Sequence, residues 1–202
     1  MIKVVIFLKR RPDLAPERFQ EHWRTRHAEL IVRLPGIRRY VQNSALDAYG
    51  AYDGVAESSF DDTQAMKALA RSPEYAAVLA DEPNFIDRAS MGSIITEEHV
   101  IKDGPAGGVK SIAFVTRKAE VPIDEFFRGW LKRGALDVRA EGLRRYVQCH
   151  TRRAIYDSGR TPPYDGVEMM WADREDALPG RAAGTAHVQR SPFLLVRERV
   201  LA

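Results

Sequence analysis

The chain has 202 residues, a formal net charge of +3 and a pI of about 9.1. Its hydrophobic (45%) and charged (29%) fractions are ordinary for a soluble globular protein, and its basic residues are scattered among acidic ones, which disfavours a nucleic-acid partner. No apolar run approaches the roughly 18 residues that span a bilayer. A single cysteine, Cys149, excludes an internal disulfide and fits a reducing compartment. We therefore expect a cytoplasmic protein with no membrane partner.

The first hundred residues predict the order β-α-β-β-α-β. Apolar β-rich runs indicate the strands, and a proline in the first turn marks the start of the first helix. In chain order the predicted elements are strand 3–8, a helix from Pro16 to the Pro35-Gly36 pair, strands 37–44 and 52–60 joined by a turn at 48–51, helices 63–70 and 74–80, and strand 91–101. This is the split βαβ, or ferredoxin-like, arrangement.

The second half predicts the same order again. Residues 104–108 have the Gly- and Pro-rich composition of a linker, which separates domains at 1–103 and 109–202. The later elements are strand 109–117, helix 122–133, strands 143–151 and 164–171, a short or broken helix within 176–186, and strand 193–200.

An internal repeat supports this division. LPGIRRYVQN at 34–43 returns as AEGLRRYVQCH at 140–150, and AYDGVAESSFDD at 51–62 returns as PYDGVEMMWADRED at 163–176. Matched blocks in the same order indicate two copies of one unit. Each unit has helices on one face of its sheet and a bare apolar face on the other. We expect the two sheets to pack together within one chain as a pseudo-dimer, and a further homodimer is left open.

The copies differ in the residues that could carry chemistry. The first helix contains HWRTRHAEL at 22–30, whereas the matching helix contains WLKRGALDV at 130–138 and has no histidine. His27 is the first candidate, as a general acid or base, because histidine titrates near neutrality. His22 lies at the opposite edge of the same apolar stripe and is a candidate substrate contact. For both, a helix-end or surface role is the competing interpretation.

Four more residues are candidate substrate contacts. Trp23 and Tyr40 have counterparts in the second copy, which favours packing, whereas Asn43 becomes Cys149 there. Glu57, taken as the counterpart of Glu168, is a candidate orienter of His27. No set of residues has the spacing of a metal site, and no phosphate-binding glycine loop is present in the sequence.

The stretches FLKRRPDLAPERFQEHWRTRHAEL, LPGIRRYVQN and AYDGVAESSFDD resemble the EthD family of the dimeric α+β barrel superfamily. The resemblance is close over the first hundred residues and looser beyond. It implies an α+β fold in which two ferredoxin-like βαββαβ units pack sheet to sheet. It also implies relatives that include cofactor-free monooxygenases, polyketide cyclases, isomerases and haem-degrading enzymes, with dehydratase-like proteins among fungal members. The fold alone therefore does not determine which reaction the protein catalyses.

Two classes of function follow from these residues. The first is a cofactor-independent lyase or dehydratase, isomerase or monooxygenase that acts on a small hydrophobic or aromatic molecule, with His27 as acid or base. The second is a non-catalytic module that binds a hydrophobic metabolite or completes another protein's barrel. Loss of His27 would abolish turnover in the first class and change affinity only modestly in the second.

Overall fold

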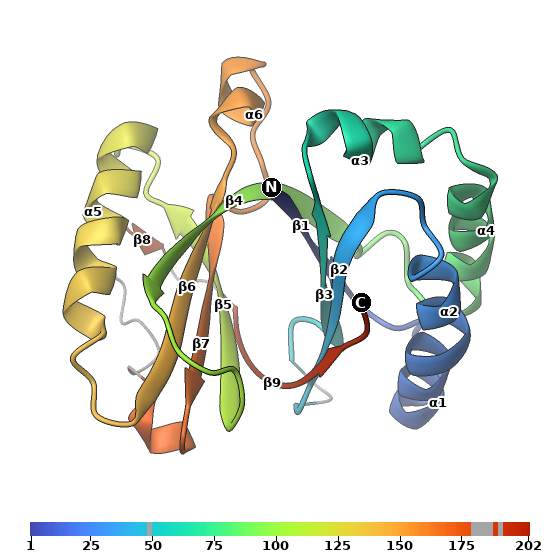
Figure 1. Cartoon of the computed structure of the whole chain (residues 1–202), viewed down its shortest axis with the longest axis horizontal. Coiled ribbons are helices and arrows are strands. Elements are labelled where there is room, and N and C mark those ends of the chain that lie inside the picture. The colour runs from blue at the N-terminus through green and yellow to red at the C-terminus, as the bar shows by residue number, and fades with distance from the viewer. Residues whose placement is uncertain (48–49, 179–187, 190–191) are drawn as a thin grey trace. The chain divides into compact units, whose positions relative to one another are not determined.

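The computed structural model describes residues 1–47, 50–178, 188–189 and 192–202, and its elements fall into two compact units (Figure 1). Unit 1 comprises Met1–Ile95 with Arg197–Ala202, and unit 2 comprises Thr96–Val196. The sequence repeat places the division at 104–108 instead, in the loop between strands β4 (Gly92–Lys102) and β5 (Val109–Arg117). The difference arises because β4 and β9 (Phe193–Val200) each contribute residues to both units.

Unit 1 follows the predicted order closely. Its elements are β1 Ile2–Leu8, α1 Pro16–His22, a π-helical turn Trp23–His27, α2 Ala28–Ile31, β2 Ile37–Ala45, β3 Gly54–Phe60, α3 Thr63–Leu69, α4 Pro73–Asp81, a 3₁₀ turn Glu82–Asn84, and the first residues of β4 Gly92–Lys102. Strand β3 lies between β1 and β2 and is antiparallel to both. The prediction that one helix begins at Pro16 holds, but its middle is a π turn and not an α-helix.

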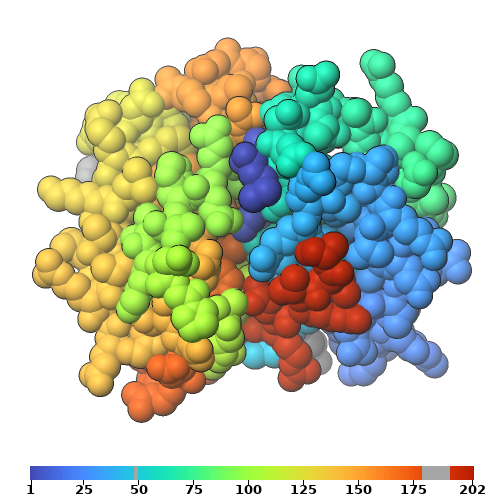
Figure 2. Space-filling model, in the orientation of Figure 1, coloured from blue at the N-terminus to red at the C-terminus, as the bar shows by residue number. Residues whose placement is uncertain are grey.

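The helices of unit 1 cover one face of this sheet (Figure 1). The core between them contains aromatic and aliphatic side chains from both layers, among them Phe19, Trp23 and Tyr40. Ser72 caps the first turn of helix α4: its hydroxyl accepts a hydrogen bond from the Tyr75 backbone N–H at 3.1 Å. Figure 2 shows the C-terminal residues, in red, lying on the blue residues of β2, where the Tyr40 backbone bonds to the chain end.

The repeated Asp-Gly pair at the start of β3 is a structural device. The Asp53 carboxylate accepts a hydrogen bond from the Arg10 backbone N–H at 2.9 Å, which fixes the end of β1. Gly54 leaves room for Trp23, since a Cβ at this glycine would lie 2.4 Å from the indole ring. The second copy repeats both features: Asp165 accepts from Arg117 at 2.7 Å, and a Cβ at Gly166 would lie 2.5 Å from the Trp130 ring.

Unit 2 is built on the same plan. Its elements are the end of β4, β5 Val109–Arg117, α5 Ile123–Asp137, β6 Leu143–Thr151, α6 Arg153–Asp157, β7 Gly166–Ala172, a 3₁₀ turn Glu175–Ala177, β8 Val188–Gln189 and β9 Phe193–Val200. Strand β7 pairs with β5 and β6, the end of β4 pairs with β6, and the start of β9 pairs with β5, all antiparallel. Helix α5 lies over one face of these strands (Figure 1).

Two details of unit 2 differ from the sequence expectations. Helix α5 continues to Asp137, four residues past its predicted end, because Gly134 does not stop it but packs against the sheet. The short helix α6 was not anticipated. Most of the segment 176–186, in which a broken helix was expected, lies in residues 179–187, which are outside the described residues.

Candidate active site

A buried carboxylate gathers two histidines in unit 1. Asp81, at the end of α4, has only 3% of its surface exposed. Its oxygens lie 3.0 Å from Nδ1 of His27 and 2.9 and 3.0 Å from Nε2 of His22. Nε of Arg26 lies 3.1 Å from the same carboxylate, and the Asn84 amide reaches it at 3.4 Å. This Asp81 cluster sits where α4 contacts the helical segment 16–31.

The π turn brings the two histidines to one side of their helix. His22 and His27 are five residues apart, and an α-helix would rotate such residues roughly 140° from one another. In a π turn the repeat is i to i+5, so residue 27 follows residue 22 on the same face. The predicted α-helical stripe has the two histidines on opposite edges, and this is corrected: both side chains converge on Asp81.

Phe85 closes the cluster on its apolar side. Its ring stacks on the His22 imidazole with centroids 4.7 Å apart and lies 4.8 Å from the His27 ring at a tilted angle. Phe85 is fully buried and also contacts Phe19, at 5.7 Å. The histidines therefore have a hydrocarbon wall on one side and a carboxylate on the other.

The electrostatics define the protonation state of the pair. Burial lowers the pKa of His27, and the hydrogen bond and charge of Asp81 oppose this only in part. Burial raises the pKa of Asp81, but hydrogen bonds from His22 and His27 outweigh it, so the net shift is downward. Near neutral pH an ionised Asp81 can only accept hydrogen bonds, which places the His27 proton on Nδ1. Nε2 of His27 then carries a lone pair and makes no hydrogen bond with any described residue.

Trp23 and Tyr40 lie in the core between helix and sheet. Both are essentially unexposed, at 0% and 1%. Gln42 connects them, since its side-chain amide donates to the Trp23 carbonyl at 2.7 Å and to the Tyr40 hydroxyl at 3.2 Å. Burial raises the pKa of Tyr40 to about 12, so its hydroxyl stays protonated. These contacts support the packing role that the sequence analysis weighed for both residues.

Asn43 and Glu57 lie on the other face of the unit 1 sheet, away from the helices. The Asn43 amide donates to Glu57 at 3.0 Å and to the Val55 carbonyl at 3.0 Å, and the Lys3 ammonium lies 2.7 Å from Glu57. The idea that Glu57 orients His27 is corrected, because Asp81 occupies that position.

The assumed pairing of Glu57 with Glu168 is also corrected. Glu57 pairs with Val41 on β2, whereas Glu168 pairs with Gln148 on β6. Gln148 is the counterpart of Gln42, whose partner on β3 is Ala56. Glu168 therefore occupies the position of Ala56.

Asp81 is the functional candidate that the sequence analysis missed. One signal was available: an acidic residue in the last turn of a helix opposes the helix dipole, so it needs another reason to be there. Such a residue near two histidines in space cannot be recognised without the fold. Among the described residues, no group of three or more His, Cys, Asp or Glu side chains is arranged to hold a metal.

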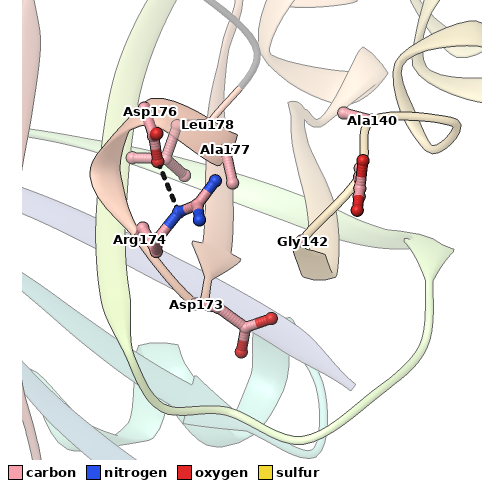
Figure 3. Close-up of a pocket in the computed structure, with 8 residues that line it drawn as sticks. Ala140, Gly142, Asp173, Arg174, Asp176, Ala177 and Leu178 are labelled. Carbon is pink, nitrogen blue, oxygen red and sulfur yellow. Dashed lines mark hydrogen bonds and ion pairs between the residues drawn. The ribbon is translucent and has the colours of Figure 1, made fainter.

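An open pocket of about 740 Å³ lies elsewhere, in unit 2 (Figure 3). Eight residues line it: Ala140, Glu141, Gly142, Asp173, Arg174, Asp176, Ala177 and Leu178. Arg174 and Asp176 pair with each other at 2.9 Å, and both are largely exposed. The lining ends at Leu178, next to the undescribed residues 179–187. This pocket contains no histidine and none of the candidate residues, so we do not assign the chemistry to it.

The fold defines the class of protein. A crystal structure described as an anthrone oxidase-like protein covers 100% of this chain and 93% of its own, with a TM-score of 0.68 and 10% identity. The structure of a candidate monooxygenase of Lactobacillus acidophilus NCFM covers 98% of this chain and 94% of its own, with a TM-score of 0.62 and 12% identity. The structure of a mutant chlorite dismutase from Candidatus Nitrospira defluvii covers 99% of this chain and 91% of its own, with a TM-score of 0.57 and 10% identity. At these identities the likeness shows the fold, and the predicted dimeric α+β barrel class is confirmed.

Residues 11–89 match the family model of the EthD domain. This match lies within unit 1 and agrees with the EthD resemblance of the sequence. The match includes the Asp81 cluster, from His22 to Asn84. No curated protein matches the chain. None of the described helices has the length and apolar character required to traverse a membrane.

Proposed function

We propose that this chain is an acid–base enzyme of the dimeric α+β barrel class that acts on a small hydrophobic or aromatic molecule. The observation that carries the proposal is the buried pair of His27 and Asp81, whose Nδ1 and carboxylate oxygen are 3.0 Å apart. A carboxylate that fixes the tautomer of a neutral imidazole is a recurring arrangement for a general base.

His27 and Asp81 divide the work in this scheme. Nε2 of His27 accepts a proton from a substrate carbon or hydroxyl, and Asp81 stabilises the imidazolium that forms. The same nitrogen returns the proton at another atom, which accomplishes an isomerisation, or gives it to a leaving hydroxyl, which accomplishes a dehydration. Proton transfer by one positioned group contributes roughly 10²–10⁴-fold to a rate. A neutral resting state suits His27 to begin as a base, and the lowered pKa supports this order.

His22 and Arg26 hold the Asp81 carboxylate in position. The His22 side chain is 24% exposed and that of Arg26 72%, so they form the solvent side of the Asp81 cluster. Their N–H groups hold Asp81 in place while His27 changes charge. Phe85 and Phe19 are fully buried and pack behind the histidines, and this apolar environment of the cluster favours a hydrophobic or aromatic substrate over a sugar or a nucleotide.

The alternative is a binding module in which the same cluster is structural. It is favoured by one observation: the candidate contacts Trp23 and Tyr40 are packed into the core and not arranged around an opening. We also keep as proposals a cytoplasmic location, independence from cofactors, a C-terminal half that descends from a second EthD unit, and a homodimer.

Comparison of wild type with His27→Gln tests the proposal. Both proteins are incubated with metabolite extracts supplemented with aromatic and polyketide-like compounds, and product masses are compared by chromatography–mass spectrometry. His99→Gln is the matched control, since His99 is in unit 2 and outside the Asp81 cluster. A compound that wild type and H99Q isomerise or dehydrate, and H27Q does not, supports the enzyme. Equal retention of one compound by all three proteins, without conversion, would favour the binding module.

A further inference from the structure

The two units share a frame of three side chains beneath their first helix. In unit 2 the Gln148 amide donates to the Trp130 carbonyl at 2.9 Å and to the Tyr146 hydroxyl at 2.7 Å. Unit 1 has the same two bonds from Gln42. In both helices a phenylalanine four residues earlier packs on the tryptophan, with ring centroids 5.6 Å apart. The frame therefore makes Trp23 the counterpart of Trp130.

Beyond this tryptophan the helical segment of unit 1 is one residue longer than α5. Before it the two helices agree, since each N-cap residue lies eight positions earlier. The C-cap valine follows the tryptophan by nine positions in unit 1, at Val32, and by eight in unit 2, at Val138. Four positions further, both chains have a glycine in the left-handed region, Gly36 with φ of 78° and Gly142 with φ of 79°. The extra residue therefore lies inside the helical segment.

The residue without a counterpart in α5 is His27. When the helices are numbered forward from the tryptophans, Arg26 corresponds to Arg133. When they are numbered back from the C-caps, Ala28 corresponds to Gly134, and both of these small residues are buried. His27 is left between the two matched runs, and it is the last residue of the π turn. A π turn contains one residue more than an α-helical turn, so it accommodates this insertion.

The π turn changes the hydrogen bonds of the helix, and a distant side chain supplies one of them. In an α-helix the Ala28 N–H would bond to the carbonyl of Arg24, four residues earlier. In this turn it bonds to the carbonyl of Thr25. The Arg24 carbonyl accepts a hydrogen bond from Nη1 of Arg199 at 2.8 Å. An arginine near the end of the chain therefore satisfies a carbonyl that the helix would ordinarily satisfy itself.

Backbone pairing of the chain end with β2 holds Arg199 in place. Residues Arg197–Ala202 belong to unit 1. The Leu201 N–H donates to the Tyr40 carbonyl at 2.9 Å, and the Tyr40 N–H donates to the Ala202 oxygen at 3.0 Å. Leu201 packs on the core beneath the helices, and Arg199, two residues earlier, lies on the same side of the extended chain. The guanidinium is therefore directed toward the π turn.

We propose that Arg199 is a positioning residue for His27, because its bond to the Arg24 carbonyl stabilises the π turn that the extra residue creates. The turn brings Nδ1 of His27 to 3.0 Å from the Asp81 carboxylate. Turns of this kind are rare within α-helices, so contacts from outside the helix must support this one. The inference rests on the proposed function, since it concerns the proposed base, but the position of the ring can be measured without a substrate.

Hydrogen exchange followed by NMR tests the role of Arg199. In Arg199→Gln the Ala28 amide proton and the Nδ1 proton of His27 should exchange about three- to tenfold faster than in wild type, because the turn opens more often without this bond. Arg199→Lys keeps a charged donor and should restore most of the wild-type rate. Arg197→Gln, which changes another exposed arginine of the same strand, is the matched control and should leave both rates unchanged. The melting temperature of all three variants should stay within about 2 °C of wild type, since both arginines are exposed.

Deletion of single residues tests the insertion itself. A chain that lacks His27 should fold with a regular helix like α5, and it should melt within about 5 °C of His27→Gln, which also lacks the imidazole. The matched control is deletion of Arg133 from α5. That helix has no extra residue, so the deletion should lower the melting temperature by more than about 10 °C.

Three results would overturn the inference. The first is equal exchange of the His27 ring proton in wild type and Arg199→Gln. The second is equal acceleration in Arg197→Gln, which would show that the bond to the helix is not the cause. The third is a chain without His27 that melts as low as the chain without Arg133. Full activity of His27→Gln on a substrate would overturn the proposed function alone, because the exchange rates are measured without a substrate.

Discussion

Replacement of Asp81 by asparagine tests the Asp81 cluster as a structural unit. Asparagine keeps the size of the side chain but removes its charge. One of the two carboxylate oxygens becomes an NH₂ group, which cannot accept the hydrogen bond that a histidine donates there. Hydrogen bonds to charged groups stabilise by about 1.5–3 kcal/mol. We count the buried His27 bond in full and discount the bonds of the partly exposed His22 and the exposed Arg26. The loss is then about 2–4 kcal/mol, or about 5–15 °C in Tm.

Thermal unfolding at pH 7, followed by circular dichroism, measures this loss. Asp61→Asn is the matched control, because Asp61 also pairs with an arginine, Arg38, but on the surface. The control should change stability by less than about 0.5 kcal/mol. If Asp81→Asn melts within a degree or two of D61N, the carboxylate does not organise the histidines and the reasoning fails.

Three further outcomes are expected. Burial and the neighbouring His99 lower the pKa of His150 to about 3. The protein should therefore lose about 2 kcal/mol of stability between pH 6.5 and 5 at this residue, because the unfolded chain binds a proton there and the folded chain does not. Denaturant unfolding at both pH values should show a smaller loss in His150→Gln than in wild type, since only the contribution of His27, whose pKa is also lowered, is left. Gly134→Ala should destabilise by about 1–3 kcal/mol through its clash with Gln148, whereas Gly129→Ala, with open space on the same helix, should stabilise by about 1 kcal/mol in the same experiment. Glu168→Ala should leave the pH 7 melting temperature within a few degrees of wild type, since alanine serves the equivalent frame; a loss above 10 °C would show that the carboxyl is structural.

Most of the architecture could be predicted from the sequence because the repeat and the apolar runs report on it directly. Strands β5, β6 and β9 have the predicted bounds, and β1, β2, β3, β4 and β7 differ by one or two residues at one or both ends. Strands made of apolar, β-rich runs can be recognised from the sequence without tertiary information. The exchange of strand ends between units leaves no local signal, so the boundary at Ile95 could not be found.

The site could be predicted only in part. The sequence pattern singled out His27 and His22, and the structure brings both side chains to Asp81; their functional roles stay a prediction. The π turn was hidden, because Phe19, Trp23 and Leu30 fit an α-helical stripe equally well. Its register depends on tertiary contacts, such as the Gln42 side chain on the Trp23 carbonyl.

Asp81 and Glu168 were missed or misassigned for a related reason. Asp81 is 54 residues from His27, and no short motif joins them. The pairing of Glu57 with Glu168 failed because a shift of one residue in a strand moves a side chain to the opposite face. Residue type suggested the pairing, and only the register of β3 and β7 decides it.

The protonation state of His27 tests the account most directly. Long-range ¹H–¹⁵N spectra of the histidine rings distinguish the two neutral tautomers from the cation, and His27→Gln assigns the signals. The account predicts a neutral ring at pH 6.5 with the proton on Nδ1 and a free Nε2, and a loss of that preference in Asp81→Asn. A cationic His27 at that pH, or a proton on Nε2 with Nδ1 unprotonated, would contradict the proposed base.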